Sequence, residues 1–197
     1  MSGKRPATYQ DVLAAPQHMV AELIDGELFL SPRPKGPHTA VASNLGVMLG
    51  SKFGHGDGGP GGWLILDEPE LHLGKRVLVP DLAGWRLSRM SSVPDGHFKV
   101  APDWVCEISS RSTERLDRKK KLPIYARAGV KHAWLIHPIA RTLLVLRREK
   151  RHWLEVDWFA EADKVRAEPF KEVALDLSRL WMHQRFRASE SYAHFEY

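Results

Sequence analysis

Two acidic residues stand where neighbouring apolar segments begin or end. Asp81 follows Pro80, which cannot donate to a sheet ladder, so a strand is expected to open there with the aspartate at its edge. Glu107 lies one residue before the end of the apolar run 104–108, where a carboxylate is costly to bury unless it is paired or holds a metal. Together with the backbone carbonyl of Ile108, these acids offer the oxygen ligands that Mg²⁺ prefers. The pattern predicts metal-dependent phosphodiester hydrolysis, because such an ion lowers the pKa of a bound water and offsets charge on the phosphorane.

A lysine near these acids would orient or deprotonate the water, or stabilise the transition-state charge. The position two residues after Glu107 is Ser109, so the lysine must come from the basic segment that follows. If that segment is helical, Asp117, Lys121 and Tyr125 share one face at i, i+4 and i+8. Lys121 is therefore the lysine expected to point toward the acids.

The chain is basic, with 29 Lys and Arg against 24 Asp and Glu and a net charge of +5. A basic balance favours polyanions such as DNA, although a run of charges also forms an ordinary solvated face. The predicted nucleic-acid contacts lie in the basic cluster around the candidate lysine: Arg111, Arg115, Arg118, Lys119 and Lys120.

The elements that must position these residues follow from periodicity and turn signals. Asp25-Gly26 predicts a type I′ hairpin between strands 18–24 and 27–31, and residues 38–53 carry a helical apolar period. Short strands are expected at 63–66, 71–73, 77–79, 82–85, 105–108, 133–136 and 142–146. A helix is expected from about residue 112 to Ala128, but Pro123 falls inside it, so this helix either starts later or is kinked beside Lys121. The order predicts an α/β (α+β) fold, a single sheet with helices on its faces.

Composition and length predict one globular domain over residues 1–187, followed by a loosely ordered tail at 188–197. No apolar run reaches the ~20 residues of a membrane span, and the amino terminus lacks the apolar segment of a secretory signal. The single cysteine, Cys106, excludes an internal disulfide and suits a reducing cytoplasm. The histidines lack the spacing of a zinc-binding helix.

The pattern Pro80-Asp81 followed by Glu107-Ile108-Ser109 resembles the PD-(D/E)XK nuclease superfamily. The nearer resemblance is to a bacterial branch of restriction-endonuclease-like proteins, formerly a domain of unknown function. It runs from about Tyr9 to Arg148 and is carried by these further runs: 22–28, His38, 80–83, 104–113, Asp117 with Lys121, 125–130 and 134–136.

This resemblance implies a restriction-endonuclease-like core, a mixed β-sheet flanked by helices with an N-terminal β-hairpin. It also implies dependence on Mg²⁺, with Mn²⁺ as a substitute, and DNA as the substrate. The family's active-site positions fall on Glu22, Asp81, Glu107 and Lys121, with the lysine moved onto the helix that follows Ser109.

Plainer readings remain open for each residue. Glu22 could face a cross-strand partner, Asp81 could cap a turn, and Glu107 could form a purely structural ion pair. The whole chain could be a catalytically inactive module that binds nucleic acid or a partner. A third possibility is a structural homodimer whose sheet edge or long helix supplies the interface. A homodimer is expected in any case, since symmetric dimers are the commonest oligomers.

Overall fold

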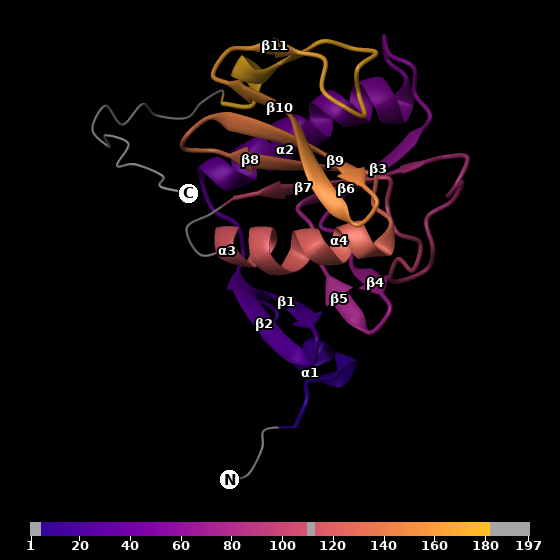
Figure 1. Cartoon of the computed structure of the whole chain (residues 1–197), viewed down its shortest axis with the longest axis vertical. Helices are drawn as coiled ribbons and strands as arrows, with labels where there is room; N and C mark the ends of the chain where they lie inside the picture. The colour runs from indigo at the N-terminus through magenta and orange to yellow at the C-terminus, as the bar shows by residue number, and fades with distance from the viewer. Residues whose placement is uncertain (1–4, 110–112, 182–197) are drawn as a thin grey trace.

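The computed structural model describes residues 5–109 and 113–181. Over these ranges the chain forms an α+β fold of two main sheets and a small two-stranded one, with helices on both faces of the larger sheet (Figure 1). The mixed sheet and the flanking helices confirm the predicted fold class, but the strands are divided between separate sheets where the sequence predicted a single one. The predicted tail, residues 188–197, lies outside the described residues. None of the helices in the described ranges has the length and apolar character needed to cross a bilayer.

The larger sheet has the strand order β10-β9-β8-β7-β6-β3. Its strands are β3 (Trp63–Asp67), β6 (Leu82–Arg86), β7 (Trp104–Ile108), β8 (His132–His137), β9 (Thr142–Glu149) and β10 (His152–Ala160). β7 and β8 pair in parallel, and the other neighbours pair antiparallel. A parallel pair needs a crossover, which here is the helical segment carrying the candidate lysine.

The smaller sheet has the order β2-β1-β5-β4 and includes the predicted N-terminal hairpin. Its strands are β1 (Met19–Ile24), β2 (Glu27–Pro32), β4 (Leu71–Leu73) and β5 (Arg76–Leu78). Asp25 and Gly26 have φ angles of 51° and 82°. Both values are positive, as a type I′ turn requires, so the turn predicted from Asp25-Gly26 is confirmed.

Alternation along the central strands separates two cores. Trp104, Cys106 and Ile108 face one core, together with helix α2 (Pro37–Leu49), while Val105 faces the other, together with helix α4 (Leu122–Ala128). Because side chains alternate between the faces of a strand, Glu107 shares the face of Val105 and lies beneath the crossover helix. Cys106 is fully buried, as a small core residue should be.

The crossover helix runs through Pro123 without a break. It consists of α3 (Glu114–Leu116), a π-helical turn η2 (Asp117–Lys121) and α4, in which Pro123 sits within the first turn. The amide of Leu122 donates to the carbonyl of Asp117, five residues back. The wider π-helical turn leads directly into α4, whose first turn does not need the amide that Pro123 lacks. The helix therefore neither starts late nor breaks beside Lys121.

The sequence reading missed one long element, β10, which forms an edge of the larger sheet. Its hairpin with β9 turns at Lys150, whose φ angle is 57°. The usual Asn or Gly signal for such a turn is missing, so the pattern gave no sign of it. The remaining elements are α1 (Tyr9–Leu13), a π-helical turn η1 (Gly50–His55) after α2, β11 (Lys164–Val165), β12 (Leu175–Asp176) and η3 (Leu177–Arg179).

A buried aspartate, Asp103, ties the central strands together. Its carboxylate accepts the Arg86 amide at 3.0 Å and pairs with Arg89 at 2.8 Å and Lys131 at 3.0 Å. Burial raises the pKa of Asp103, but these donors together lower it by more than burial raises it. The pKa of Asp103 therefore lies below its usual range.

Asp103→Asn is expected to lower the free energy of unfolding at pH 7 by ~1.5–3 kcal/mol, the usual worth of hydrogen bonds to a charged group. The carboxylate stabilises above its unfolded pKa of ~3.9, and the contribution is lost as pH falls through the lower folded-state pKa. Urea unfolding from pH 7 downward should therefore show the difference from wild type shrinking in acid. Asp95→Asn, at an exposed loop position, is the control and should change little. A pH-independent difference at Asp103 would contradict this explanation.

Candidate active site

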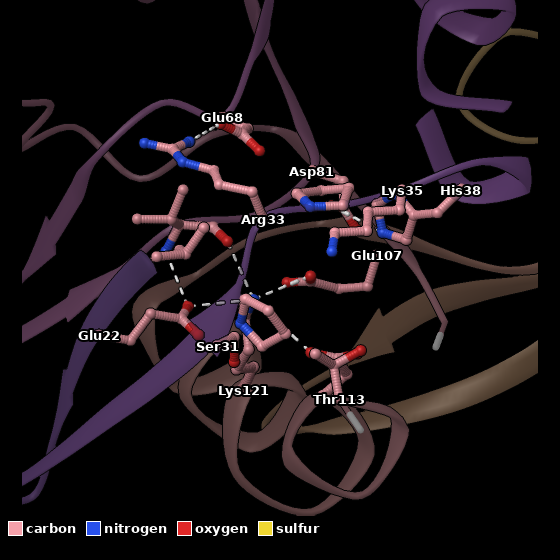
Figure 2. A pocket seen from close by; sticks show the side chains of 15 residues that line it. Glu22, Ser31, Arg33, Lys35, His38, Glu68, Asp81, Glu107, Thr113 and Lys121 are labelled. Atoms are coloured by element: carbon pink, nitrogen blue, oxygen red, sulfur yellow. Dashed lines mark hydrogen bonds and ion pairs between the residues drawn. The ribbon is translucent and has the colours of Figure 1, made fainter. Parts of the chain in front are cut away.

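A cavity of about 300 Å³ lies where the two sheets, the start of α2 and the crossover helix meet (Figure 2). Its wall carries all four predicted catalytic residues: Glu22, Asp81, Glu107 and Lys121. They come from β1, the residue directly before β6, β7 and η2, so segments separated by up to a hundred residues supply one site. Their catalytic role stays a prediction, while their convergence is a fact of the structure.

Lys121 is the centre of this cluster. Its Nζ lies 2.9 Å from Glu107 Oε2, 3.0 Å from Glu22 Oε1 and 3.6 Å from Asp117 Oδ1, and it donates to the carbonyl of Val79 at 3.0 Å. The exposed fraction of Lys121 is 3%, so the ammonium is removed from bulk water and held among acceptors. The pairing with Asp117 is the i, i+4 relation expected from the sequence.

Glu107 uses both carboxylate oxygens within the protein. Oε2 pairs with Lys121, and Oε1 accepts the hydroxyl of Tyr125 at 2.7 Å. Lys121 and Tyr125 lie one helical turn apart, and together they orient the carboxylate from above the sheet. The ion pair considered for Glu107 is therefore present, although an ion pair and a catalytic role do not exclude each other.

Asp81 lies beside Glu107 on the same face of the sheet. Leu82 pairs with Cys106 in the β6/β7 register, so the next residues outward, Asp81 and Glu107, are neighbours across the strands. Asp81 Oδ2 accepts the backbone amide of Ile108 at 2.6 Å. The acid is thus tied to the adjacent strand and does not cap its own turn.

His38 holds the other oxygen of Asp81. Its Nε2 lies 3.2 Å from Asp81 Oδ1, and its side chain is mostly buried at the beginning of α2. Burial lowers the pKa of His38, but Asp81 and then the backbone of Ile108 raise it by more. From the sequence, His38 had no role beyond the family resemblance, and only the packing of α2 against the sheet shows that its side chain faces Asp81.

Glu22 reaches the site from the N-terminal hairpin. Its Oε1 accepts the amide of Val79 at 2.8 Å in addition to the pair with Lys121. Its neighbour across the hairpin is Phe29, so no cross-strand ion pair accounts for this acid. The carboxylate links the smaller sheet to the crossover helix.

The cluster holds more acid than base. Burial is the largest cause raising the pKa of Glu107; Lys121 opposes it, and Asp117, Asp81 and Glu22 add to it. Asp117 follows the same pattern, and its pKa rises to about 6. For Lys121, burial lowers the pKa, but Glu107 and Glu22 raise it well above its usual value, so the amine remains an ammonium. Such an excess of buried negative charge is the environment that a divalent cation relieves.

The rim of the cavity is cationic. Arg33 and Lys35 line it from the loop between β2 and α2, and Arg33 pairs with Glu68 (Figure 2). These two residues were not among the sites predicted from the sequence, although two positive charges directly before a helix were an available signal.

The predicted nucleic-acid contacts lie elsewhere. Arg115, Arg118, Lys119 and Lys120 are exposed on the crossover helix, and none of them lines the cavity. Arg118 pairs with Glu114 within the helix. Arg111 lies outside the described residues. The four described side chains therefore form a basic surface beside the site, and their contact with nucleic acid stays a prediction.

A mixed sheet with acids at the ends of two central strands and a lysine close by defines the restriction-endonuclease-like, PD-(D/E)XK class of proteins. The chain belongs to the Uma2 family, described as "Putative restriction endonuclease", whose profile matches residues 6–178. The predicted family is thereby confirmed, and fold and family together support a nuclease. A search of curated proteins finds no match.

Among solved structures, the chain is similar to the crystal structure of a protein from Anabaena variabilis, titled a "putative nuclease belonging to DUF820". The two are 26% identical, with a TM-score of 0.72. The match covers 89% of this chain and 98% of the other, so it includes the whole architecture that carries the site.

Proposed function

We propose that this protein is a Mg²⁺-dependent DNA endonuclease, in which Asp81 and Glu107 hold the metal and Lys121 acts on the attacking water. The observation that carries the proposal is the convergence of four acids on one cavity: Lys121 pairs with Glu22, Glu107 and Asp117, and Asp81 lies beside Glu107 and pairs with His38. This crowding of acids raises the pKa of Glu107 and of Asp117, and a bound divalent cation would relieve it.

The donor set fits Mg²⁺ or Mn²⁺. Carboxylate oxygens of Asp81 and Glu107 and the backbone carbonyl of Ile108 would hold the ion, since hard divalent cations select oxygen ligands. When bound, the metal would supply a water of lowered pKa and positive charge against the phosphoryl oxygens. The same residues, with Glu22 assisting directly or through water, are the ones predicted from the sequence.

Lys121 acts as a cation in this proposal. Its raised pKa argues against a role as general base, because the group would have to lose a proton that Glu107 and Glu22 stabilise. A fixed ammonium can instead donate to the attacking water and to developing charge on a phosphoryl oxygen. Glu22 and Glu107 hold it in place through contacts of 3.0 and 2.9 Å.

His38 is a positioning residue. Its Nε2 contacts Asp81, so it orients the carboxylate whose second oxygen is bound by the Ile108 amide. Lys35 and Arg33 at the rim would meet substrate phosphates, and the exposed basic surface of the crossover helix would add contacts that weaken with salt.

The test is cleavage of DNA by the purified full chain. Supercoiled plasmid and single-stranded DNA should be cut in Mg²⁺ or Mn²⁺ and left intact in EDTA, because the residues alone provide no activated water. The control is an Asp81→Asn preparation purified in parallel, which detects contaminating nucleases. If neither substrate is cut with either metal, the proposal of catalysis fails.

A second candidate is a catalytically inactive module that binds nucleic acid or a partner. It is favoured by the closed arrangement at Glu107, whose two oxygens already bond to Lys121 and Tyr125. Such a module should bind no Mn²⁺ at Asp81, and Asp81→Ala should leave DNA affinity unchanged or raise it. An endonuclease should instead lose Mn²⁺ binding in that variant, so metal titration distinguishes the two.

Three expectations from the sequence remain predictions: a single domain over residues 1–187, a homodimer and a cytoplasmic location. Analytical ultracentrifugation of the full chain decides the second. A monomer would not conflict with the site, because all its described groups come from one chain.

A further inference from the structure

A second group of potential ligands lies outside the carboxylate site. Glu70, His72 and His97 each offer one atom, and these atoms all lie within 4.8 Å of one another. Glu70 Oε1 and His72 Nε2 are 2.7 Å apart. Glu70 and His72 flank Leu71 at the beginning of β4, and residues two apart on a strand project to the same side.

His97 comes from the long loop after β6 and is held by backbone pairing. The amide of His72 donates to the carbonyl of Phe98 at 2.8 Å, and the amide of Phe98 donates to the carbonyl of Glu70 at 2.9 Å. The Phe98 side chain is buried and stacks on Trp85, with ring centroids 4.9 Å apart. These backbone hydrogen bonds anchor the loop, and the His97 ring stacks on the His72 ring with their centroids 3.6 Å apart.

Tyr9 supports the same group from helix α1. Its hydroxyl donates to Glu70 Oε1 at 2.8 Å, and its ring meets the His72 ring edge-on with centroids 4.7 Å apart. Ligands at protein metal sites are commonly oriented by such outer hydrogen bonds. Three segments far apart in the sequence thus converge on one partly buried cluster of imidazole and carboxylate groups.

From this arrangement we infer that Glu70, His72 and His97 form a zinc site, separate from the carboxylate cluster. Two imidazoles and one carboxylate are a ligand set that Zn²⁺ accepts, with a fourth position left for water or another ligand. Imidazole nitrogen favours Zn²⁺ over Mg²⁺, whereas the all-oxygen set around Asp81 favours Mg²⁺. The two sites therefore differ in the metal that they select.

Ligand atoms ~2.0–2.1 Å from a tetrahedral ion lie roughly 3.4 Å apart. The Glu70–His72 pair is a 2.7 Å contact and the two imidazoles are stacked, so ion binding requires these side chains to spread apart within the 4.8 Å span of the group. The ion would fasten α1 and the loop after β6 to β4, so it acts on stability and not on the phosphodiester chemistry.

The experiment is a Zn²⁺ titration of chelator-treated, untagged full chain, by calorimetry and by the visible spectrum of Co²⁺ as a substitute. Wild type should bind with a tetrahedral Co²⁺ spectrum, and zinc should raise its melting temperature, because an ion bound only to the folded state stabilises it. His72→Gln and His97→Asn should each abolish the spectrum. Tyr9→Phe should weaken Zn²⁺ binding ~10-fold or more, as the loss of an outer hydrogen bond commonly does.

Two variants separate this site from the proposed nuclease centre. Glu107→Gln should keep the Co²⁺ spectrum, since the ion is held elsewhere, and His152→Asn controls for loss of any exposed histidine. Binding that persists in both His72→Gln and His97→Asn, or that disappears in Glu107→Gln, would overturn the assignment. So would the lack of any Zn²⁺ binding by wild type. None of these results depends on whether DNA is cut.

Discussion

Asp81→Asn is expected to reduce metal-dependent DNA cleavage by at least ~10³-fold while the protein remains folded. A metal held by Asp81 and Glu107 would supply several kcal/mol of transition-state stabilisation, and each ~1.4 kcal/mol is tenfold in rate. The amide side chain has one neutral oxygen in place of two charged ones, so it is a poor ligand for Mg²⁺. That oxygen can still accept the Ile108 amide that now binds Asp81, which preserves the link between β6 and β7.

Single-turnover cleavage of plasmid in Mg²⁺ measures the effect, and urea unfolding checks the fold. Asp67→Asn is the matched control. Asp67, on β3, pairs with Leu82 of β6, so it lies near Asp81, but it does not line the cavity. Its cleavage rate should equal that of wild type. A normal rate in Asp81→Asn, with metal dependence retained, would show that this aspartate holds no catalytic ion.

Lys121→Met is expected to lower the free energy of unfolding by ~3–5 kcal/mol, because removing one partner of a buried ion pair leaves uncompensated charge. Methionine fills similar space but donates nothing, so Glu107 and Glu22 lose contacts of 2.9 and 3.0 Å and the Val79 carbonyl loses its donor. Urea unfolding at neutral pH measures the loss. This is a stability effect that accompanies any loss of cleavage.

The double variant Lys121→Met with Glu107→Gln tests the cause. If unpaired charge causes the loss of unfolding free energy, neutralising Glu107 should restore part of that free energy. The double variant should then unfold at a higher urea concentration than Lys121→Met alone. Lys120→Met is the surface control, since Lys120 is exposed and lies 3.9 Å from an exposed glutamate. Additive losses from the two site changes would point to packing and not to charge.

Local features of the sequence determined much of this fold. Asp25-Gly26 tolerates positive φ at both positions, and the hairpin turns there. The apolar run of β7 admits one carboxylate, and alternation sends Glu107 to the face opposite its apolar neighbours. Helical spacing brought Asp117, Lys121 and Tyr125 to one side of the crossover. Each of these inferences depends on residues within a few positions of one another.

Other features were not evident from the sequence. The strand β10 is an edge strand whose turn carries Lys and Arg where Gly or Asn would signal it. Pro123 predicted a disturbed helix, but the π-helical turn before it removed the conflict. In the sequence, Glu70 and His72 look like two polar positions of an ordinary alternating strand. They become a group of potential metal ligands only when the folded chain brings His97 beside them.

The candidate active site was also predicted only in part from the sequence. The sequence alone marked Asp81, Glu107 and Lys121 as residues whose types suit metal-dependent hydrolysis, and resemblance added Glu22. Only the tertiary structure decided that one ammonium is shared between Glu22 and Glu107, and that His38 faces Asp81. The physical reason is that ion pairing in a cavity depends on distances between separate elements, which the packing of both sheets against the helices determines.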